Sequence, residues 1–316
     1  MTIGSNMTKL VTYTSGDRPS LGAVQGDLII DLARANSAFP QDVPSGDGWT
    51  ADSVSFLSAG APALQALKNV IENVSRLDAA DARRDVLLVQ SASVRLLPPI
   101  PAPPKIICVG RNYGKHAEEA GRPISEIPII FARFAKTLVA PGDNVVVPHV
   151  SHQLDWEGEL AVIIGKPGRY ISRQNALDHV AGYSIFNDVT VRDYQFRITQ
   201  YTAGKNFSHT GPFGPYLVLR DEITDPHALQ ITTTLNGEVV QSGNTREMLF
   251  DIPAIIEHLS EFIDLEPGDV IPMGTPAGVG FTRKPPRFLR NGDVITVEIE
   301  GLGALSNPVV DERELA

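Results

Sequence analysis

The most informative pattern of apolar and polar positions lies between residues 154 and 195. There, Glu157 and Glu159 flank a glycine and are followed at once by an apolar run over residues 160–164. A short run rich in β-branched residues that ends at a glycine predicts a buried strand. Side chains alternate between the two faces of a strand, so both glutamates are expected on the same face.

A second apolar segment over residues 180–186 predicts another strand, and it ends in Asn187-Asp188. If the two strands pair, Asp188 would join Glu157 and Glu159 at one point. Adjacent buried carboxylates repel each other and lose hydration, and a divalent cation would remove that cost. The spacing contains no Cys or His, which favours Mg²⁺ or Mn²⁺ over zinc.

The same two glutamates also fit the solvated face of an edge strand. The apolar run behind them argues against that interpretation, because it predicts a strand that is buried on both faces. Spacing alone leaves both interpretations open.

Elsewhere, alternation and helical periodicity predict a small N-terminal domain and a larger C-terminal domain. Residues 94–104 contain five prolines in eleven positions, a composition typical of an extended linker. The predicted divisions are an N-terminal domain over 1–95, a linker over 96–104 and a catalytic domain over 105–316. The predicted elements are strands at 9–13, 21–24, 28–32 and 105–110, a loop at 40–49, helices at 52–77 and 252–262, and a hairpin at 232–240 around Asn236-Gly237.

Four further residues carry candidate chemistry. His116 and Glu119 are three residues apart, so on a helical turn they share a face. A carboxylate beside an imidazole raises its basicity and fixes its tautomer, as a general base requires, although such a pair is also common on solvated turns. A helix after Asp188 would direct Arg192 back towards that carboxylate. Lys205 is either a buried cation near the site or an ordinary surface lysine.

Composition narrows the possible partners. The net charge is −10 and no basic block is present, which argues against nucleic acid or an anionic membrane as partner. Cys108 is the only cysteine, so no intrachain disulfide can form, and a reducing, cytoplasmic location is predicted. No segment has the length and apolarity of a membrane span. The chain also lacks nucleotide-binding glycine motifs and the G-x-S-x-G motif of serine hydrolases.

Taken together, six segments resemble the fumarylacetoacetate hydrolase family. They span about residues 105–305, and they are VGRNYGKHAEE, DWEGELAVIIGK, FNDVTVRD, GKNFSHTGPFGP, NGEVVQSGNTREMLFDI and PGDVIPMGTPAGVG. The resemblance is to bacterial acylpyruvases and related 2-oxo acid hydrolases and isomerases. It implies an α+β, mostly β fold: a rolled, mixed β-sandwich or barrel as the C-terminal domain, with a small N-terminal α/β domain. It also implies a homodimer.

The resemblance assigns roles to individual residues. Glu157, Glu159 and Asp188 match the family's metal ligands, commonly for Mg²⁺ or Mn²⁺. His116 and Glu119 match the dyad of hydrolytic members, and Lys205 matches a lysine that steadies a developing anion. The implied substrate contacts are Arg111, Tyr113, Arg192, Gln195 and Thr275.

These groups suit metal-dependent hydrolysis of a C–C bond in a 2,4-dioxo acid, an acylpyruvate such as fumarylpyruvate. Water activated by the dyad would attack, and the bond would break through a metal-stabilised enolate to give pyruvate and a carboxylic acid. The first alternative is decarboxylation, isomerisation or hydration of a 2-oxo diacid through the same enolate. A remote alternative is a non-catalytic binder of oxo acids. In each case the expected partner is a small molecule.

Overall fold

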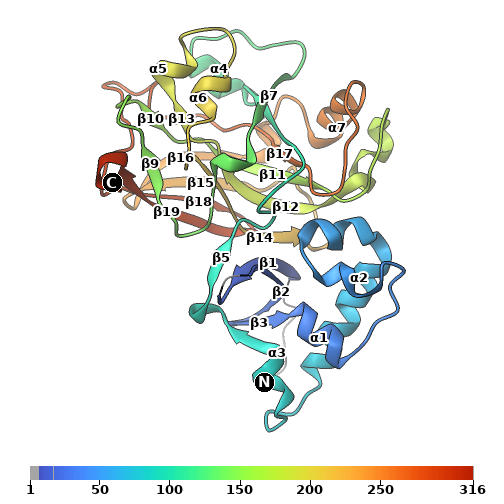
Figure 1. Cartoon of the computed structure of the whole chain (residues 1–316). Helices are drawn as coiled ribbons and strands as arrows, with labels where there is room; N and C mark the ends of the chain where they lie inside the picture. Colours follow the sequence, from blue (N-terminus) through green and yellow to red (C-terminus); the bar gives the residue numbers. More distant parts are fainter. Residues whose placement is uncertain (1–6, 17, 316) are drawn as a thin grey trace.

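The computed structural model describes residues 7–16 and 18–315. The outer ends of the two predicted domains, residues 1–6 and 316, lie outside the described residues. Two large sheets form the body of the molecule, and short helices cover its edges (Figure 1).

One twelve-stranded sheet runs through both the N-terminal and the C-terminal parts of the chain. Its main path follows the order β4-β3-β2-β1-β14-β12-β11-β17-β6-β7, with β5 paired to β1 and β8 paired to β14. The strands are β1 (Lys9–Thr14), β2 (Ser20–Gln25), β3 (Leu28–Asp31), β4 (Leu88–Gln90), β5 (Arg95–Leu97), β6 (Ile106–Gly110), β7 (Ile129–Arg133), β8 (Leu138–Val139), β11 (Gly158–Ile164), β12 (Val180–Asn187), β14 (Gly211–Leu219) and β17 (Val270–Pro272).

The N-terminal and C-terminal parts meet where β1 pairs antiparallel with β14. The proline-rich segment contributes β5, which pairs with β1, so this segment is extended but also belongs to the sheet. The domain boundary at residues 96–104 stays a prediction.

A second sheet of five strands packs against the first. It consists, in spatial order, of β16 (Glu238–Asn244), β15 (Gln230–Leu235), β18 (Val294–Ile299), β19 (Gly303–Asp311) and β9 (Val145–Val147). Buried side chains from both sheets, such as Leu160, Ile231 and Val297, form one apolar core between them. The architecture is therefore an α+β, mostly β sandwich, as predicted. In the described residues the sheets do not close into a barrel.

The helices are short except for one in the N-terminal part. They are α1 (Leu32–Ala38), α2 (Ser53–Ser75), α3 (Arg83–Leu87), α4 (Gly114–Glu119), α5 (Arg192–Gln195), α6 (Thr202–Lys205) and α7 (Ile252–Ser260); β10 (Leu154–Asp155) and β13 (Thr190–Val191) form a small separate ribbon. None of the described helices combines the length and the apolarity needed to cross a bilayer.

Local sequence signals account for several of these elements. β11 is buried along its whole length, which confirms the prediction made from its apolar run. Asn236 and Gly237 adopt positive φ angles of 53° and 83° and connect β15 to β16 as predicted. The expected loop at 40–49 instead runs into a short 3₁₀ turn over Gly46–Thr50.

The helices α4, α5 and α6 gather at the end of the molecule opposite the N-terminal part (Figure 1). This end contains the pocket described next. The described residues that line it all lie at or after Val109 in the sequence.

Candidate active site

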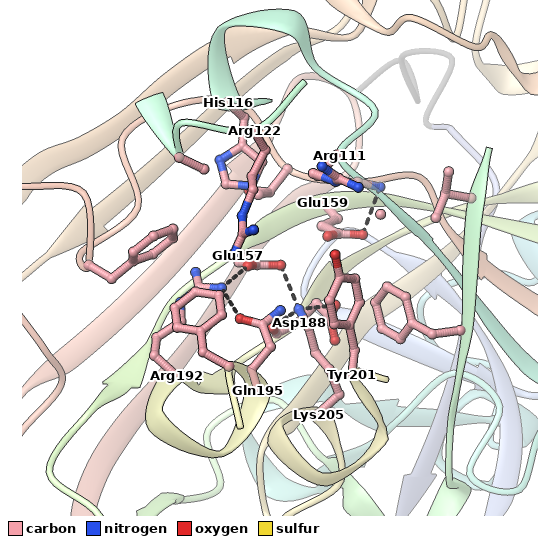
Figure 2. Close-up of a pocket in the computed structure, with 18 residues that line it drawn as sticks. Arg111, His116, Arg122, Glu157, Glu159, Asp188, Arg192, Gln195, Tyr201 and Lys205 are labelled. Carbon is pink, nitrogen blue, oxygen red and sulfur yellow. Dashed lines mark hydrogen bonds and ion pairs between the residues drawn. The ribbon is translucent and has the colours of Figure 1, made fainter. Parts of the chain in front are cut away.

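Three buried carboxylates come together where β11 begins and β12 ends. β11 pairs antiparallel with β12, and Gly158 lies opposite Asn187. The Asp188 N–H donates to the Glu157 carbonyl at 2.8 Å, and this contact fixes the turn that carries Asp188. As a result, Glu157, Glu159 and Asp188 each offer an oxygen within 4.8 Å of the others (Figure 2).

Gly158, between the two glutamates, permits the close approach of the second sheet. A Cβ atom at this position would lie 2.4 Å from Thr233 Oγ1 and 2.9 Å from Val297 Cγ1. Any side chain here would therefore push β11 away from β15 and β18.

We expect Gly158→Ala to destabilise the fold by roughly 1–3 kcal/mol, because overpacking forces neighbouring side chains out of their preferred rotamers and shifts the backbone. The displacement would also misplace both glutamates, so divalent-cation affinity should fall. Chemical denaturation and a Mn²⁺ titration measure the two effects. Gly48→Ala is the matched control, since a Cβ at Gly48 has no neighbour within 4 Å; equal stability of the two variants would contradict the packing argument.

Two buried cations bind the carboxylates. Lys205 donates from Nζ to Glu157 Oε2 at 2.7 Å and to Asp188 Oδ2 at 2.5 Å. Arg192 contacts Glu157 Oε1 through Nη1 at 2.7 Å and Asp155 Oδ2 through Nε at 2.8 Å. Helical spacing predicted that Arg192 points towards Asp188. The structure instead shows Arg192 paired with Glu157 and Asp155, because the main chain turns at β13 before α5 begins.

With all four of its carboxylates ionised, the cluster carries one more negative charge than positive charge. Its buried carboxylates are Asp155, Glu157, Glu159 and Asp188, and its buried cations are Arg133, Arg192 and Lys205. Glu159 is the carboxylate without an ion-pair partner in the described residues, although it accepts a hydrogen bond from Gly274 N at 2.8 Å.

The electrostatics of the two glutamates differ accordingly. Burial alone would raise the pKa of Glu157, but Lys205 and Arg192 lower it to about 2. Burial, together with Asp188 and Glu157, raises the pKa of Glu159 well above its ordinary value. An uncompensated carboxylate beside two others, all oxygen donors, fits a hard divalent cation such as Mg²⁺ or Mn²⁺.

We expect Lys205→Met to destabilise the protein by about 3–5 kcal/mol in the absence of metal, because it leaves Glu157 and Asp188 short of a buried cation. Added Mn²⁺ should restore part of the loss by supplying positive charge. Denaturant unfolding with chelator and with Mn²⁺ measures both quantities. Lys136→Met, at an exposed position, serves as the control. A loss no larger than the control's would show that Lys205 is not needed to hold the carboxylates together.

The predicted dyad forms on α4. His116 is buried, and its Nδ1 lies 2.9 Å from Glu119 Oε1. Glu119 is itself held by the Gly278 N–H, which lies 2.9 Å from Oε2, and by the Thr282 hydroxyl at 3.3 Å. With Nδ1–H donating to Glu119, the basic nitrogen of the ring is Nε2.

The structure gathers most of the predicted substrate contacts around one pocket and leaves one outside it. Arg111, Gln195 and Thr275 line the pocket together with His116 and the carboxylates, whereas Tyr113 does not. Tyr113, which directly precedes α4, is buried in the main apolar core instead. Its hydroxyl finds no hydrogen-bond partner among the described residues.

Sequence reasoning missed several residues of the site. Asp155 belongs to the same alternating motif as Glu157 and Glu159, so the two-residue period could have revealed it. It accepts hydrogen bonds from Gly280 N at 2.7 Å and Phe281 N at 3.0 Å. These bonds tie the end of the glycine-rich loop over residues 274–280 to the site. Arg122 and Arg133 carry no comparable signal in the sequence.

A family model, curated sequences and solved structures all relate this chain to the same group of enzymes. Residues 105–310 match the family described as fumarylacetoacetate (FAA) hydrolase C-terminal. A mitochondrial oxaloacetate tautomerase of Xenopus laevis is 42% identical over 308 residues, which are 96% of this chain and 90% of that protein. The solved fumarylacetoacetate hydrolase of Exiguobacterium antarcticum is 36% identical, with a TM-score of 0.77 over 96% of this chain and 100% of that one. The solved maleylpyruvate hydrolase of Sphingobium sp. SYK-6, in complex with manganese(II) and pyruvate, is 30% identical, with a TM-score of 0.74 over 96% and 99% of the two chains.

Proposed function

Because the chain belongs to the fumarylacetoacetate hydrolase family, we propose that it interconverts the keto and enol forms of a short 2-oxo diacid, with oxaloacetate as the first substrate to test. The observation that carries the proposal is the group Glu157, Glu159 and Asp188. Each of them offers one oxygen within 4.8 Å of the others, and all three line the same pocket as His116. The similarity to the Xenopus oxaloacetate tautomerase supports the choice of substrate.

We assign a divalent cation, Mg²⁺ or Mn²⁺, to Glu157, Glu159 and Asp188. The donor set is all oxygen, and the surplus negative charge of the cluster favours a cation there. When bound, the cation would polarise the 2-oxo group as a Lewis acid and so acidify the neighbouring C–H bond.

In this proposal His116 moves the proton. Nε2 takes a proton from carbon 3 of the keto form and returns it to the oxygen on carbon 2, so the substrate's atoms are conserved. Glu119 holds the ring in the tautomer that leaves Nε2 free to act as the base. Lys205, which lies between two of the carboxylates, places its positive charge beside the oxygen on which negative charge develops.

The cationic groups around the pocket suit a short acid with two carboxylates. Arg192 Nη2 is buried without a hydrogen-bond partner among the described residues, and we assign it to the carboxylate next to the oxo group. Arg122 forms no ion pair in the part of the chain that the structure describes and lies over Phe196, 5.9 Å from the ring centroid. Figure 2 places Arg122 and Arg111 on the opposite side of the pocket from Lys205, where a distal carboxylate would lie. The cavity volume of about 60 Å³ favours a short substrate.

Hydrolysis of a C–C bond in an acylpyruvate is the second candidate. The His116–Glu119 pair that favours it could equally take a proton from water. The hydroxide would add to the 4-oxo carbon, the bond between carbons 3 and 4 would break, and the products would be pyruvate and a carboxylic acid. The similarity to the Sphingobium maleylpyruvate hydrolase supports this candidate.

One assay separates the two candidates. Enol oxaloacetate is mixed with the protein in Mn²⁺ or Mg²⁺ and the enol absorbance is followed, while a parallel series with acylpyruvates is analysed by mass. Metal-dependent acceleration of enol loss without C–C cleavage supports the tautomerase. Pyruvate and a carboxylic acid from an acylpyruvate would support the hydrolase instead, and inactivity in both series would refute the proposal.

Assembly and location are part of the same proposal. We propose a homodimer, as the family resemblance implies, and a cytoplasmic location, as the single cysteine suggests. Sedimentation of the purified chain and fractionation of its host cell test these two statements independently of the assay.

A further inference from the structure

Arg133 contacts the carboxylate cluster from outside the pocket lining. It is the last residue of β7, its side chain is 0% exposed, and it does not line the cavity. Its Nη1 donates to Asp188 Oδ1 at 2.6 Å and to the Val189 carbonyl at 3.1 Å. Its Nη2 donates to Thr210 Oγ1 at 2.9 Å.

Burying this guanidinium carries a cost. Arg133 Nε is buried and lacks a hydrogen-bond partner among the described residues, and unsatisfied buried donors are unfavourable. An apolar side chain at the end of β7 would avoid that cost. The contacts of Arg133 therefore require an explanation beyond packing.

The two oxygens of Asp188 are divided between different partners. Oδ1 faces Arg133, whereas Oδ2 faces Lys205. A carboxylate without such support can rotate and present either oxygen, or both, to a cation. With Arg133 on Oδ1 and Lys205 on Oδ2, the plane of the Asp188 carboxylate is held in one orientation, and each oxygen keeps a lone pair.

We propose that Arg133 is a positioning residue that fixes the orientation in which the Asp188 carboxylate meets the divalent cation. This inference rests on the proposed function, because it presupposes the cation at the carboxylate cluster. The fork of the guanidinium is essential, since two separate nitrogens reach Asp188 and Thr210 from one side chain. A lysine has one nitrogen and cannot reproduce both contacts.

The charge of Arg133 and its contact with Asp188 are expected to have opposite effects on divalent-cation affinity. Removing a buried positive charge makes the cluster more negative, which by itself would strengthen cation binding. Losing the orientation of Asp188 would weaken it. Arg133→Lys keeps the charge and loses the fork, whereas Arg133→Met loses both, so the pair of variants separates the two effects.

The test is a Mn²⁺ titration of the full chain, followed by the EPR signal of free Mn²⁺, with circular dichroism to verify folding. Loss of a group that orients a metal ligand typically weakens affinity by roughly 10–100-fold, and we expect a loss in that range for Arg133→Lys. We also expect Arg133→Met to bind no more tightly than the wild type. Arg95→Lys is the matched control, because Arg95 makes an exposed fork to Asp143, away from the site.

Each outcome bears on the inference. Wild-type affinity in Arg133→Lys, with tighter binding in Arg133→Met, would overturn it and leave a purely electrostatic role. If an Arg133 variant does not fold, Thr210→Val removes the second support of the fork and should still weaken Mn²⁺ binding several-fold; unchanged affinity there would overturn the inference. If the wild type itself binds no Mn²⁺, the proposed metal site fails as well, so the two failures are distinguishable.

Discussion

Replacing Asp188 by Asn is expected to abolish Mn²⁺ binding at the carboxylate cluster and to lower turnover by on the order of 10³-fold or more. The substitution keeps the size of the side chain and removes its charge. Lewis-acid stabilisation by a bound cation is worth several kcal/mol, and each 1.36 kcal/mol corresponds to a factor of ten in rate. The amide would also present an N–H group to either Arg133 or Lys205, both of which are donors. A Mn²⁺ titration and the oxaloacetate assay measure the two effects.

The control for this variant is Asp178→Asn. Asp178 is an exposed acid that pairs with Arg220 far from the pocket, and its loss should leave Mn²⁺ affinity and turnover close to wild type. Retention of Mn²⁺ affinity in Asp188→Asn would contradict the assignment of the metal ligands. Loss of Mn²⁺ with full activity would instead remove the cation from the reaction.

The proximity of Glu157, Glu159 and Asp188 could be predicted from the sequence, because it depends only on strand alternation and on the pairing of two neighbouring strands. Strand alternation places Glu157 and Glu159 on one face, and pairing of β11 with β12 brings Asp188 beside them. The hairpin at Asn236-Gly237 and the helix near Ile252 were predictable for similar reasons, since turn chemistry and periodicity act over a few residues.

Contacts between distant segments were not accessible in this way. Arg133 and Asp188 are 55 residues apart, and nothing in their spacing reveals that β7 ends behind the turn after β12. The pairing of β1 with β14, which joins the two parts of the chain in one sheet, is hidden for the same reason. The division into domains at 96–104 rested on composition, and composition does not report strand pairing.

The position of Arg192 illustrates how a local rule fails. Helical spacing alone would direct its side chain towards Asp188, yet β13 and the small ribbon with β10 come first and reorient the chain. Arg192 consequently reaches Asp155 and Glu157. Asp155 also accepts hydrogen bonds from the backbone N–H groups of Gly280 and Phe281, so this aspartate links Arg192 to the glycine-rich loop.

Replacing His116 by Gln is expected to lower kcat by roughly 10²–10⁴-fold, the usual contribution of a positioned general acid or base. Gln retains polar character and can still hydrogen-bond to Glu119, but it cannot exchange a proton at neutral pH. His116 is not a ligand in the assigned metal site, so Mn²⁺ affinity should stay close to wild type. Steady-state kinetics on enol oxaloacetate and the Mn²⁺ titration give the two readouts.

His179→Gln provides a control matched in burial, because His179 is 8% exposed and His116 is 7% exposed. His179 binds the Lys166 carbonyl through Nδ1 at 2.9 Å and does not line the pocket, so this variant should keep normal turnover. If His116→Gln lost Mn²⁺ affinity and turnover to the same extent, His116 would act through the metal site and not as the proton carrier. A selective fall in kcat would instead place the proton transfer on Nε2, since Glu119 occupies the other ring nitrogen in the folded protein.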